Sequence, residues 1–255
     1  MKALILNSGL GSRMGEITKT HPKCMTEIYE NETIVSRQLK LLNKIGIKEV
    51  VMTTGPFVDN LINYCKSLNI DMNYSFVNNP IYKETNYIYS IYCAKNYLND
   101  DIIMMHGDLV YEESVLKDIV NNEKSSMVVT STLPLPEKDF KAVIQNNKIK
   151  KIGIEYFDNA ITAQPLYKIK KEDWCIWLNS IIDFCENNQR LCYAENAFNE
   201  VSDKCHLYGF DIKDRLCMEI DNKNDLEIVK NKVKELKKWK KQKMRKSFIC
   251  ACQLT

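Results

Sequence analysis

Residues 1–23 read MKALILNSGLGSRMGEITKTHPK, in which a short apolar strand runs into glycines at positions 9 and 11. Arg13 follows directly, and Lys23 comes ten residues later. Glycines at this spacing let backbone N–H groups approach phosphate oxygens without obstruction by a Cβ, and the two cations can add charge-assisted hydrogen bonds. The stretch therefore predicts a loop that surrounds a nucleoside triphosphate.

Two common phosphate-binding motifs do not match the spacing of this loop. A P-loop needs four residues between its first glycine and a Gly-Lys-Ser or Gly-Lys-Thr sequence, which the stretch lacks. The dinucleotide fingerprint needs a third glycine at position 14, where this chain has Met14, and Gly15 comes one residue late. A structural glycine-rich turn after an edge strand is the remaining alternative for the isolated segment.

The first 130 residues alternate short apolar runs with helical repeats, a pattern that predicts a parallel sheet with crossover helices. The sequence therefore predicts an α/β fold, with a Rossmann-like, mixed and mostly parallel sheet flanked by helices. We expect strands at residues 3–6, 50–53, 71–77, 101–106 and 127–131, and helices at residues 33–44, 57–68, 85–98 and 114–120.

The pattern changes after Pro134-Leu135-Pro136. Asn146-Asn147 suits a two-residue turn with positive φ, so the flanking residues should form a small β-hairpin. We expect residues 134–215 to cover the carboxyl edge of the sheet and to hold a second substrate. The elements expected in this part and beyond are strands at 142–145, 148–154, 161–169 and 216–220, and helices at 171–187 and from 224 to about 245.

The composition is that of a soluble globular protein, with 255 residues of which 45% are hydrophobic and 27% charged. No run approaches about 18 apolar residues, and the N-terminus lacks a signal-peptide pattern, so no stable membrane insertion is expected. The ten cysteines are scattered, which favours reduced thiols in a cytoplasmic protein over a disulfide framework. A net charge of +3 gives little support to nucleic-acid binding.

Two aspartates follow predicted strands at the edge where open parallel sheets bind ligands. Asp108 comes after the apolar run 102–105, and Asp221 comes after Met218-Glu219-Ile220. Mg²⁺ prefers oxygen ligands and is usually held by one or two carboxylates together with substrate phosphates. The two aspartates therefore predict a magnesium site, although a turn aspartate at 108 and a helix N-cap at 221 are alternatives.

The end of the chain is strongly basic, since ten basic residues and one acid, Glu235, lie between Lys230 and Lys246. Such a run most often forms a solvated helix face. Packing against a second copy in a homodimer, or contact with an acidic membrane surface, are the alternatives. The pair at Cys250 and Cys252 is too close for a tetrahedral zinc site.

Taken together, these motifs resemble the sugar-phosphate nucleotidyltransferase superfamily over nearly the whole chain. Its first signature is a strand, Gly-x-Gly-Ser/Thr-Arg and a loop ending in Pro-Lys, which here covers residues 4–14 and Pro22-Lys23. Gly107-Asp108 is similar to its first metal motif, and Glu219-Ile220-Asp221 before Asn224-Asp225-Leu226 is similar to its second.

Two further features resemble the small cytidylyltransferase branch of this superfamily. Most members have two alanines where this chain has Asn7-Ser8, and that variant resembles the branch acting on phosphocholine, 2-aminoethylphosphonate or phosphoglutamine. The run from Asn79-Pro80 through Thr85-Asn86 to Ser90 is also similar to a motif of this branch near the nucleotide and acceptor. The helix-capping role of Thr85 is the alternative there.

The resemblance implies attack by a phosphate or phosphonate oxygen of an acceptor on the α-phosphorus of CTP, with release of pyrophosphate and with Mg²⁺ as cofactor. Arg13 would clamp the β- and γ-phosphates, and Lys23 would stabilise the α-phosphoryl group. Asp108 and Asp221 would hold the metal, and Lys141 would bind the acceptor. The residues expected to bind the nucleotide are Leu6, Asn7, Ser8, Gly9, Gly11, Ser12, Thr54, Gly55, Asn86 and Ser90.

Within the branch, the likeness is greatest to CTP:phosphoglutamine cytidylyltransferase, which is associated with capsule phosphoramidate. The alternatives are a sugar-1-phosphate uridylyl- or thymidylyltransferase and an inactive nucleotide-binding regulatory module. Residues 1–229 would form the nucleotidyltransferase domain, and residues 230–255 a basic helix and tail. His21 and His106 lie beside expected site residues, but a lone histidine is more often structural, so neither is assigned a role.

Overall fold

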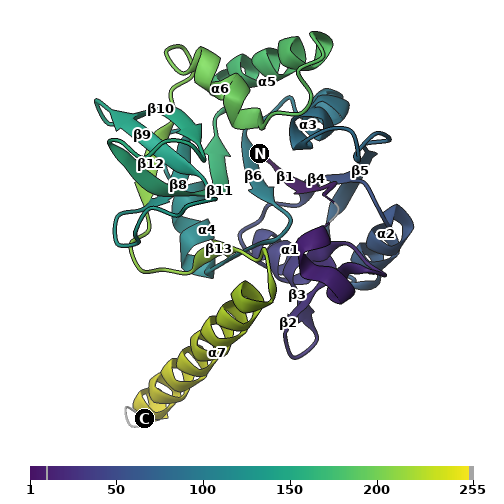
Figure 1. Cartoon of the computed structure of the whole chain (residues 1–255). Helices are drawn as coiled ribbons and strands as arrows, with labels where there is room; N and C mark the ends of the chain where they lie inside the picture. The colour runs from purple at the N-terminus through teal and green to yellow at the C-terminus, as the bar shows by residue number, and fades with distance from the viewer. Residues whose placement is uncertain (10, 253–255) are drawn as a thin grey trace.

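A computed structural model describes residues 1–9 and 11–252, with the side chains of residues 240, 241 and 243–252 not described (Figure 1). Nine strands of this described chain form one mixed sheet, whose main path runs β10-β9-β11-β6-β1-β4-β5. Helices flank the sheet, which confirms the expected α/β fold with a mostly parallel centre. Two small two-stranded sheets, β13-β7 and β2-β3, complete the described strands.

The first half of the sheet is parallel, because β1 pairs in the same direction with β4 and with β6, and β4 pairs with β5. The register places Asn7 opposite Thr54 and Leu6 opposite His106, so the carboxyl ends of three strands meet at one edge. The elements of this half are β1 (Lys2–Asn7), α1 (Ile34–Lys44), β4 (Glu49–Thr54), α2 (Val58–Ser67), β5 (Asn73–Asn78), α3 (Tyr87–Ala94), β6 (Ile102–His106) and α4 (Glu113–Val120).

The second half is mainly antiparallel and is organised by the long strand β11, which pairs with β6, β8 and β9. The expected hairpin is present, and Asn146 and Asn147 both have positive φ, at 51° and 62°. Its elements are β8 (Ser126–Thr130), β9 (Lys141–Gln145), β10 (Lys148–Gly153), β11 (Ala160–Ile169), α5 (Lys171–Glu186), α6 (Ala194–Val201) and β12 (Tyr208–Asp211).

Several short elements do not follow from the sequence pattern, among them α6 and β12. The others are β2 (Glu27–Tyr29), β3 (Glu32–Thr33), β7 (Leu109–Tyr111) and the 3₁₀ segments Ser12–Thr18, Lys23–Met25 and Lys95–Tyr97. The expected strand near residue 218 is present as β13 (Cys217–Glu219). It pairs with β7, and this pairing brings Glu219 beside Leu109.

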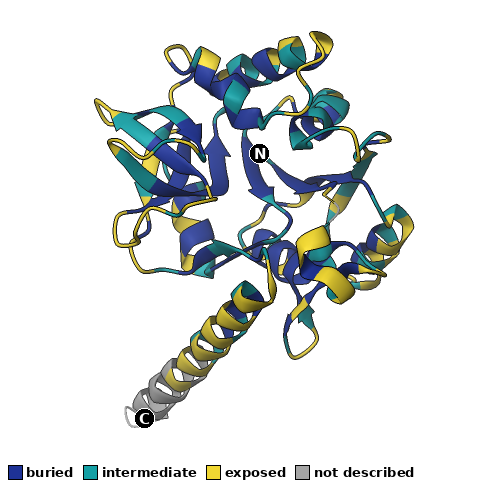
Figure 2. Ribbon diagram, in the orientation of Figure 1, coloured by how far each residue is buried: buried dark blue, intermediate teal, exposed yellow. Residues whose placement is uncertain are grey.

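Strand β1 divides the hydrophobic core, because its successive side chains point to opposite faces of the sheet. Leu4 and Leu6 pack in one cluster with the inner faces of α3, α5 and α6. Ala3 and Ile5 pack in a second cluster with α1, α2 and α4. Figure 2 shows the result, in which the central strands β1, β4, β6 and β11 are buried and the helices are exposed on their outer sides.

The first turns of helix α7 (Lys223–Cys252) pack against the rest of the protein. Val229 and Val233 are fully buried, and the Nζ of Lys237 lies 3.0 Å from a carboxylate oxygen of Glu32. The helix then extends away from the sheet (Figure 1). The expected boundary at residues 229 and 230 therefore falls inside α7.

The cysteines whose side chains are described are all free thiols. The pair at 250 and 252 lies outside the described side chains. Among the described residues, no helix is both long enough and apolar enough to cross a membrane.

Trp177 offers a test of the packing between α5 and α6. It is fully buried, and its Nε1 donates to the carbonyl of Ala194 over 2.8 Å. Trp177→Ala should lower the free energy of unfolding by about 4 kcal/mol, because it leaves a large cavity. Urea denaturation measures the loss. The matched control Leu191→Ala, at a side chain that is 77% exposed, should change stability by less than about 0.5 kcal/mol. Equal losses in the two variants would contradict this packing.

Candidate active site

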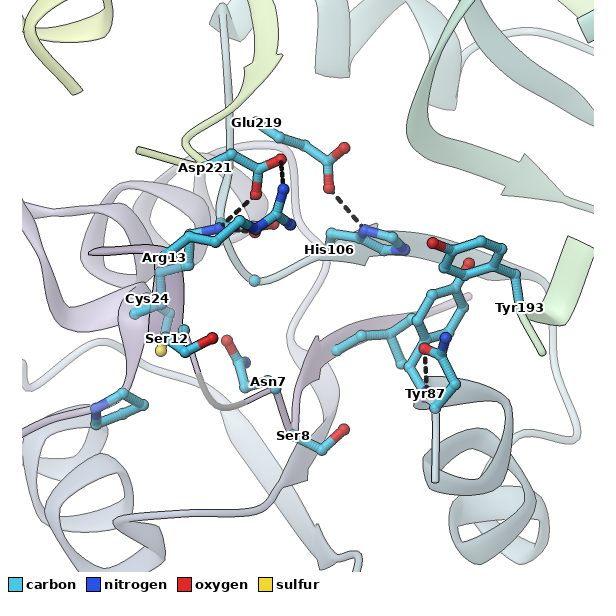
Figure 3. A pocket seen from close by; sticks show the side chains of 18 of the residues that line it. Asn7, Ser8, Ser12, Arg13, Cys24, Tyr87, His106, Tyr193, Glu219 and Asp221 are labelled. Carbon is cyan, nitrogen blue, oxygen red and sulfur yellow. Dashed lines mark hydrogen bonds and ion pairs between the residues drawn. The ribbon is translucent and has the colours of Figure 1, made fainter. Parts of the chain in front are cut away.

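A cavity of about 610 Å³ opens at the carboxyl ends of β1 and β6. Figure 3 shows its side chains converging from the loop after β1, from the end of β6, from α3 and from the segments around Tyr193 and Asp221. The expected site residues that line it are Leu6, Asn7, Ser8, Gly9, Gly11, Ser12, Arg13, Lys23, Asn86, Asp108 and Asp221.

The loop after β1 owes its path to Gly11, which has a φ of 64° in the left-handed region. A Cβ at this position would also lie 3.3 Å from the Cβ of Lys23. The Oγ1 of Thr18 donates to the carbonyl of Gly11 over 2.9 Å, and Met14 is buried beneath the loop. These contacts fold the loop back so that Arg13 and Lys23 reach the same cavity.

The charged end of the cavity is organised around Lys23. Its Nζ lies 2.6 Å from Oδ2 of Asp108 and 2.9 Å from Oδ1 of Asp221. The Nη1 of Arg13 lies 2.9 Å from the other carboxylate oxygen of Asp221. Two cations and two carboxylates therefore form one continuous group at the strand ends. Lys23 is largely buried, whereas the Arg13 side chain is 68% exposed and can reach into the open cavity.

Burial and ion pairing act in opposite directions on these charges. Burial alone would lower the pKa of Lys23, but Asp108 and Asp221 outweigh it and the pKa is raised. Burial would likewise raise the pKa of Asp108, but Lys23 and then His106 hold that pKa below its usual value. Both members of the pair are therefore charged at neutral pH.

The turn before α7 is capped by neighbours of Asp221 rather than by its own carboxylate. The turn before α7 is closed by Asn222, whose Oδ1 accepts from the N–H of Asn224, and by Asp225, whose Oδ2 accepts from the N–H of Asp221. The carboxylate of Asp221 is thus free of capping and faces Lys23 instead. Gly107 precedes Asp108 because a Cβ there would lie 1.7 Å from Oδ1 of Asn7.

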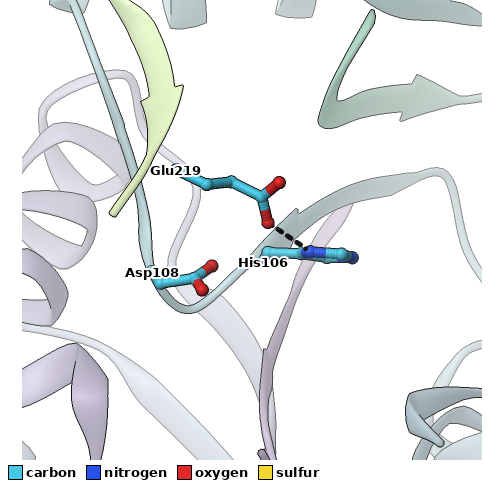
Figure 4. Close-up of side chains that lie close together, drawn as sticks. All are labelled: His106, Asp108 and Glu219. Carbon is cyan, nitrogen blue, oxygen red and sulfur yellow. Dashed lines mark hydrogen bonds and ion pairs between the residues drawn. The ribbon is translucent and has the colours of Figure 1, made fainter. Parts of the chain in front are cut away.

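The aspartates fit a magnesium ion. One oxygen of each converges on the point that the Lys23 ammonium occupies, and hard carboxylate oxygens are the ligands Mg²⁺ takes. His106, Asp108 and Glu219 form a second group, with ligand atoms within 4.8 Å of one another (Figure 4). A mixed nitrogen and oxygen set suits transition metals better than Mg²⁺. The Asp108 and Asp221 pair is therefore the better magnesium candidate.

His106 also lines the cavity, although its position beside expected site residues did not lead us to assign it a role from the sequence. Its Nδ1 lies 2.8 Å from Oε1 of Glu219. Burial lowers the pKa of His106, but the Glu219 carboxylate outweighs this effect and raises it to about 9. Burial and the neighbouring Asp108 raise the pKa of Glu219 to about 7. The sequence feature that could have predicted a site role for His106 is its position at a strand end, two residues before Asp108.

Aromatic rings form the wall opposite the charged end (Figure 3). The ring of Tyr87 meets His106 edge-on, with centroids 4.8 Å apart, and lies 5.8 Å from Tyr193. Phe140 contacts Tyr193 edge-on at 5.2 Å. We call Tyr87, His106, Phe140 and Tyr193 the aromatic wall. These residues come from four separate segments, so only the tertiary fold brings them together.

Four expected site residues do not line the cavity: Thr54, Gly55, Ser90 and Lys141. Two of them, Ser90 and Gly55, lie against Ser8. The Oγ of Ser90 lies 2.6 Å from Oγ of Ser8, and a Cβ on Gly55 would lie 2.5 Å from the Ser8 carbonyl oxygen. Thr54 is buried at the end of β4. These residues therefore support the loop rather than face the cavity.

Lys141 is fully buried, and its Nζ donates to the carbonyls of Asp139 over 3.0 Å and of Ile154 over 2.8 Å. Burial lowers its pKa. Asn86 does face the cavity and is also the N-cap of α3, because its Oδ1 accepts from the N–H of Tyr87 over 2.8 Å. The capping role that was the alternative for Thr85 therefore belongs to Asn86.

The comparisons with known structures agree with this architecture. A CTP:phosphocholine cytidylyltransferase from Streptococcus pneumoniae superimposes with a TM-score of 0.72 at 18% identity, covering 91% of this chain and 98% of that one. An inositol-1-phosphate CTP transferase from T. maritima gives 0.73 at 21% identity, covering 92% and 96%. The fold is therefore that of nucleotidyltransferases.

The chain belongs to the MobA-like NTP transferase domain family, whose model matches residues 3–136, just over half of its length. A CTP:phosphoglutamine cytidylyltransferase from Campylobacter jejuni is 32% identical over 135 residues, covering 51% of this chain and 52% of that protein. A choline-phosphate cytidylyltransferase from Haemophilus influenzae is 28% identical over 131 residues, covering 51% and 54%. The chain thus spans about half the length of these curated relatives.

Competition between Lys23 and a metal ion can be tested by thermal unfolding. In Lys23→Met the two carboxylates lose the ammonium that occupies their meeting point, so Mg²⁺ should bind about tenfold more tightly, which corresponds to ~1.4 kcal/mol. Saturating Mg²⁺ should then raise the midpoint of the variant by roughly 3 to 6 °C more than that of the wild type. Lys19→Met, an exposed lysine outside the cavity, is the control. An equal or smaller shift in Lys23→Met would refute the competition.

Proposed function

We propose that this protein transfers CMP from CTP to the phosphate of a small phosphorylated metabolite and releases pyrophosphate. The observation that carries the proposal is the group of opposite charges formed by Arg13, Lys23, Asp108 and Asp221. Two cations can offset part of the charge of a triphosphate, and two carboxylates suit the Mg²⁺ that accompanies it. The cytidylyltransferases among the relatives support CTP as the nucleotide.

The chain's own residues would act by alignment and by charge stabilisation. A phosphate or phosphonate oxygen is anionic at neutral pH, so its attack on the α-phosphorus needs no general base. Lys23 would stabilise the α-phosphoryl group and the incoming anion, and Arg13 would bind the outgoing β- and γ-phosphates. Mg²⁺ held by Asp108 and Asp221 would neutralise further charge on the triphosphate.

Asn7 is well placed to contact the nucleotide. Its side chain lines the cavity at the end of β1 and is only 7% exposed, and its Nδ2 has no hydrogen-bond partner among the described residues. A buried amide donor without a partner is costly, so a bound ligand that accepts from it gains affinity. We assign this donor to CTP, together with the backbone of Leu6, Ser8, Gly9, Gly11 and Ser12.

The acceptor would occupy the part of the cavity between the charged end and the aromatic wall. Phosphoglutamine is our first choice, which would place the reaction in capsule phosphoramidate synthesis, and 2-aminoethylphosphonate and phosphocholine follow. Lys141 would act on the acceptor through the backbone of Asp139, since its ammonium holds that carbonyl. We also propose a cytoplasmic location and no nucleic-acid partner. Packing of α7 against a second copy in a homodimer is our alternative to a solvated helix face.

Two rival functions make different predictions. A sugar-1-phosphate uridylyl- or thymidylyltransferase would share the charged group but would prefer UTP or dTTP. An inactive regulatory module would bind a nucleotide without turnover. The presence of both aspartates beside Lys23 favours an active enzyme, because a binding module has no need of two metal-binding acids.

The proposal is tested by measuring pyrophosphate release with each of four NTPs and Mg²⁺ against phosphoglutamine, 2-aminoethylphosphonate, phosphocholine and sugar 1-phosphates. We expect turnover with CTP and one of the first three acceptors. Lys23→Ala should lower kcat by about 100- to 1000-fold, because it removes a charge at the reacting phosphorus. Lys19→Ala is the matched control and should retain wild-type rates. Turnover with UTP and a sugar phosphate, or none with any pair, would contradict the proposal.

A further inference from the structure

Glu195 is a buried carboxylate outside the charged group described above. It is 1% exposed and lies in the first turn of α6, where the helix dipole favours a negative charge. No cation is paired with it among the described residues. A buried carboxylate needs hydrogen-bond donors for both of its oxygens, so its partners indicate what it does.

Its partners are two tyrosine hydroxyls from different elements. Tyr167 of β11 donates to Oε1 over 2.6 Å, and Tyr87 of α3 donates to Oε2. Burial and then the Glu195 charge raise the pKa of both tyrosines well above their usual value, so both keep their protons and act as donors. Through these hydrogen bonds, Glu195 of α6 connects α3 with β11.

Tyr87 connects this hydrogen-bond network to the cavity. Its hydroxyl is held by Glu195, while its ring lines the cavity and meets His106 and Tyr193 in the aromatic wall. Tyr193 precedes Glu195 by two residues and is the N-cap of α6. The main chain of α6 is itself anchored, because Trp177 donates to the carbonyl of Ala194. Glu195 therefore holds Tyr87 directly, and Tyr193 lies at the same end of α6 as Glu195.

We infer that Glu195 is a positioning residue that sets the acceptor end of the active site through Tyr87. Glu195 and Tyr167 do not line the cavity, so neither contacts the substrate. The charged end is held separately, by Lys23 and the two aspartates. Changes at Glu195 should therefore weaken binding of the acceptor and leave CTP binding intact. This inference rests on the proposed function, because the proposed function places the acceptor beside the aromatic wall.

Steady-state kinetics of three variants test the inference. Glu195→Ala should raise KM for the acceptor about tenfold, with kcat and KM for CTP within about twofold of wild type. Glu195→Gln should keep KM for the acceptor within about threefold, because the amide oxygen accepts from one tyrosine hydroxyl and the amide nitrogen donates to the other. Tyr167→Phe removes one hydrogen bond to Glu195 and leaves the residues that line the cavity unchanged. It should raise KM for the acceptor by about three- to fivefold, and this variant tests the inference even if Glu195→Ala fails to fold.

Asp173→Asn is the matched control. Asp173 is 8% exposed and accepts from Oγ of Ser125 over 2.5 Å and from the N–H of His206 over 2.8 Å, but it lies away from the cavity. It should lower thermal stability without changing KM for the acceptor. An increase in KM for the acceptor in Asp173→Asn as large as that in Tyr167→Phe would overturn the inference. Equal increases in KM for the acceptor and for CTP in the Glu195 and Tyr167 variants would also overturn it.

NMR of ring-labelled tyrosines separates this inference from the proposed function. Tyr167→Phe should shift the ring signals of Tyr87 and Tyr193 whether or not the acceptor is known. Unchanged signals would overturn the role of Glu195. A wild-type protein that turns over no acceptor would contradict the proposed function instead, and the ring signals would still decide whether Glu195 positions the wall.

Discussion

The placement of the Lys23 ammonium between two carboxylates is the interaction on which the rest of the site depends. It joins residues 85 and 198 positions apart in the sequence, so it connects the loop after β1, the end of β6 and the turn before α7. Such a buried pair needs both partners, because removing one leaves an uncompensated charge. The parallel sheet makes the arrangement available, since the register of β1 and β6 brings the strand ends together. The loop, the aspartates and the cavity are therefore parts of one electrostatic unit.

The two ends of the cavity are built from different physical interactions. Opposite charges hold the end that faces the loop after β1, whereas edge-on ring contacts and a buried tyrosine–carboxylate network hold the aromatic wall. In the proposed function the charged end serves the triphosphate and the metal, and the wall serves the acceptor. Among the described residues the two networks share no hydrogen bond, so acceptor specificity could change while the charged end stays the same.

Much of the fold could be predicted from local signals. The apolar run of β1 and the Asn146-Asn147 turn depend on few residues, and both elements are present where expected. Helix α6 was missed because its eight residues are stabilised mainly by packing against α5. At the site, the loop after β1 identified Lys23, strand ends identified Asp108 and Asp221, and the three side chains do meet. The aromatic wall and Glu195 come from separate segments, so no spacing in the sequence relates them. The family resemblance suggested a ligand contact for Lys141, but its ammonium donates to backbone carbonyls.

A crystal structure with a non-hydrolysable CTP analogue and Mn²⁺ tests the central claim most directly, because the anomalous signal locates the ion. We expect one Mn²⁺ bound to a carboxylate oxygen of each of Asp108 and Asp221, with the Nζ of Lys23 moved from the carboxylates to the phosphates. An ion bound elsewhere, with Lys23 still bridging the two aspartates beside the bound nucleotide, would contradict it.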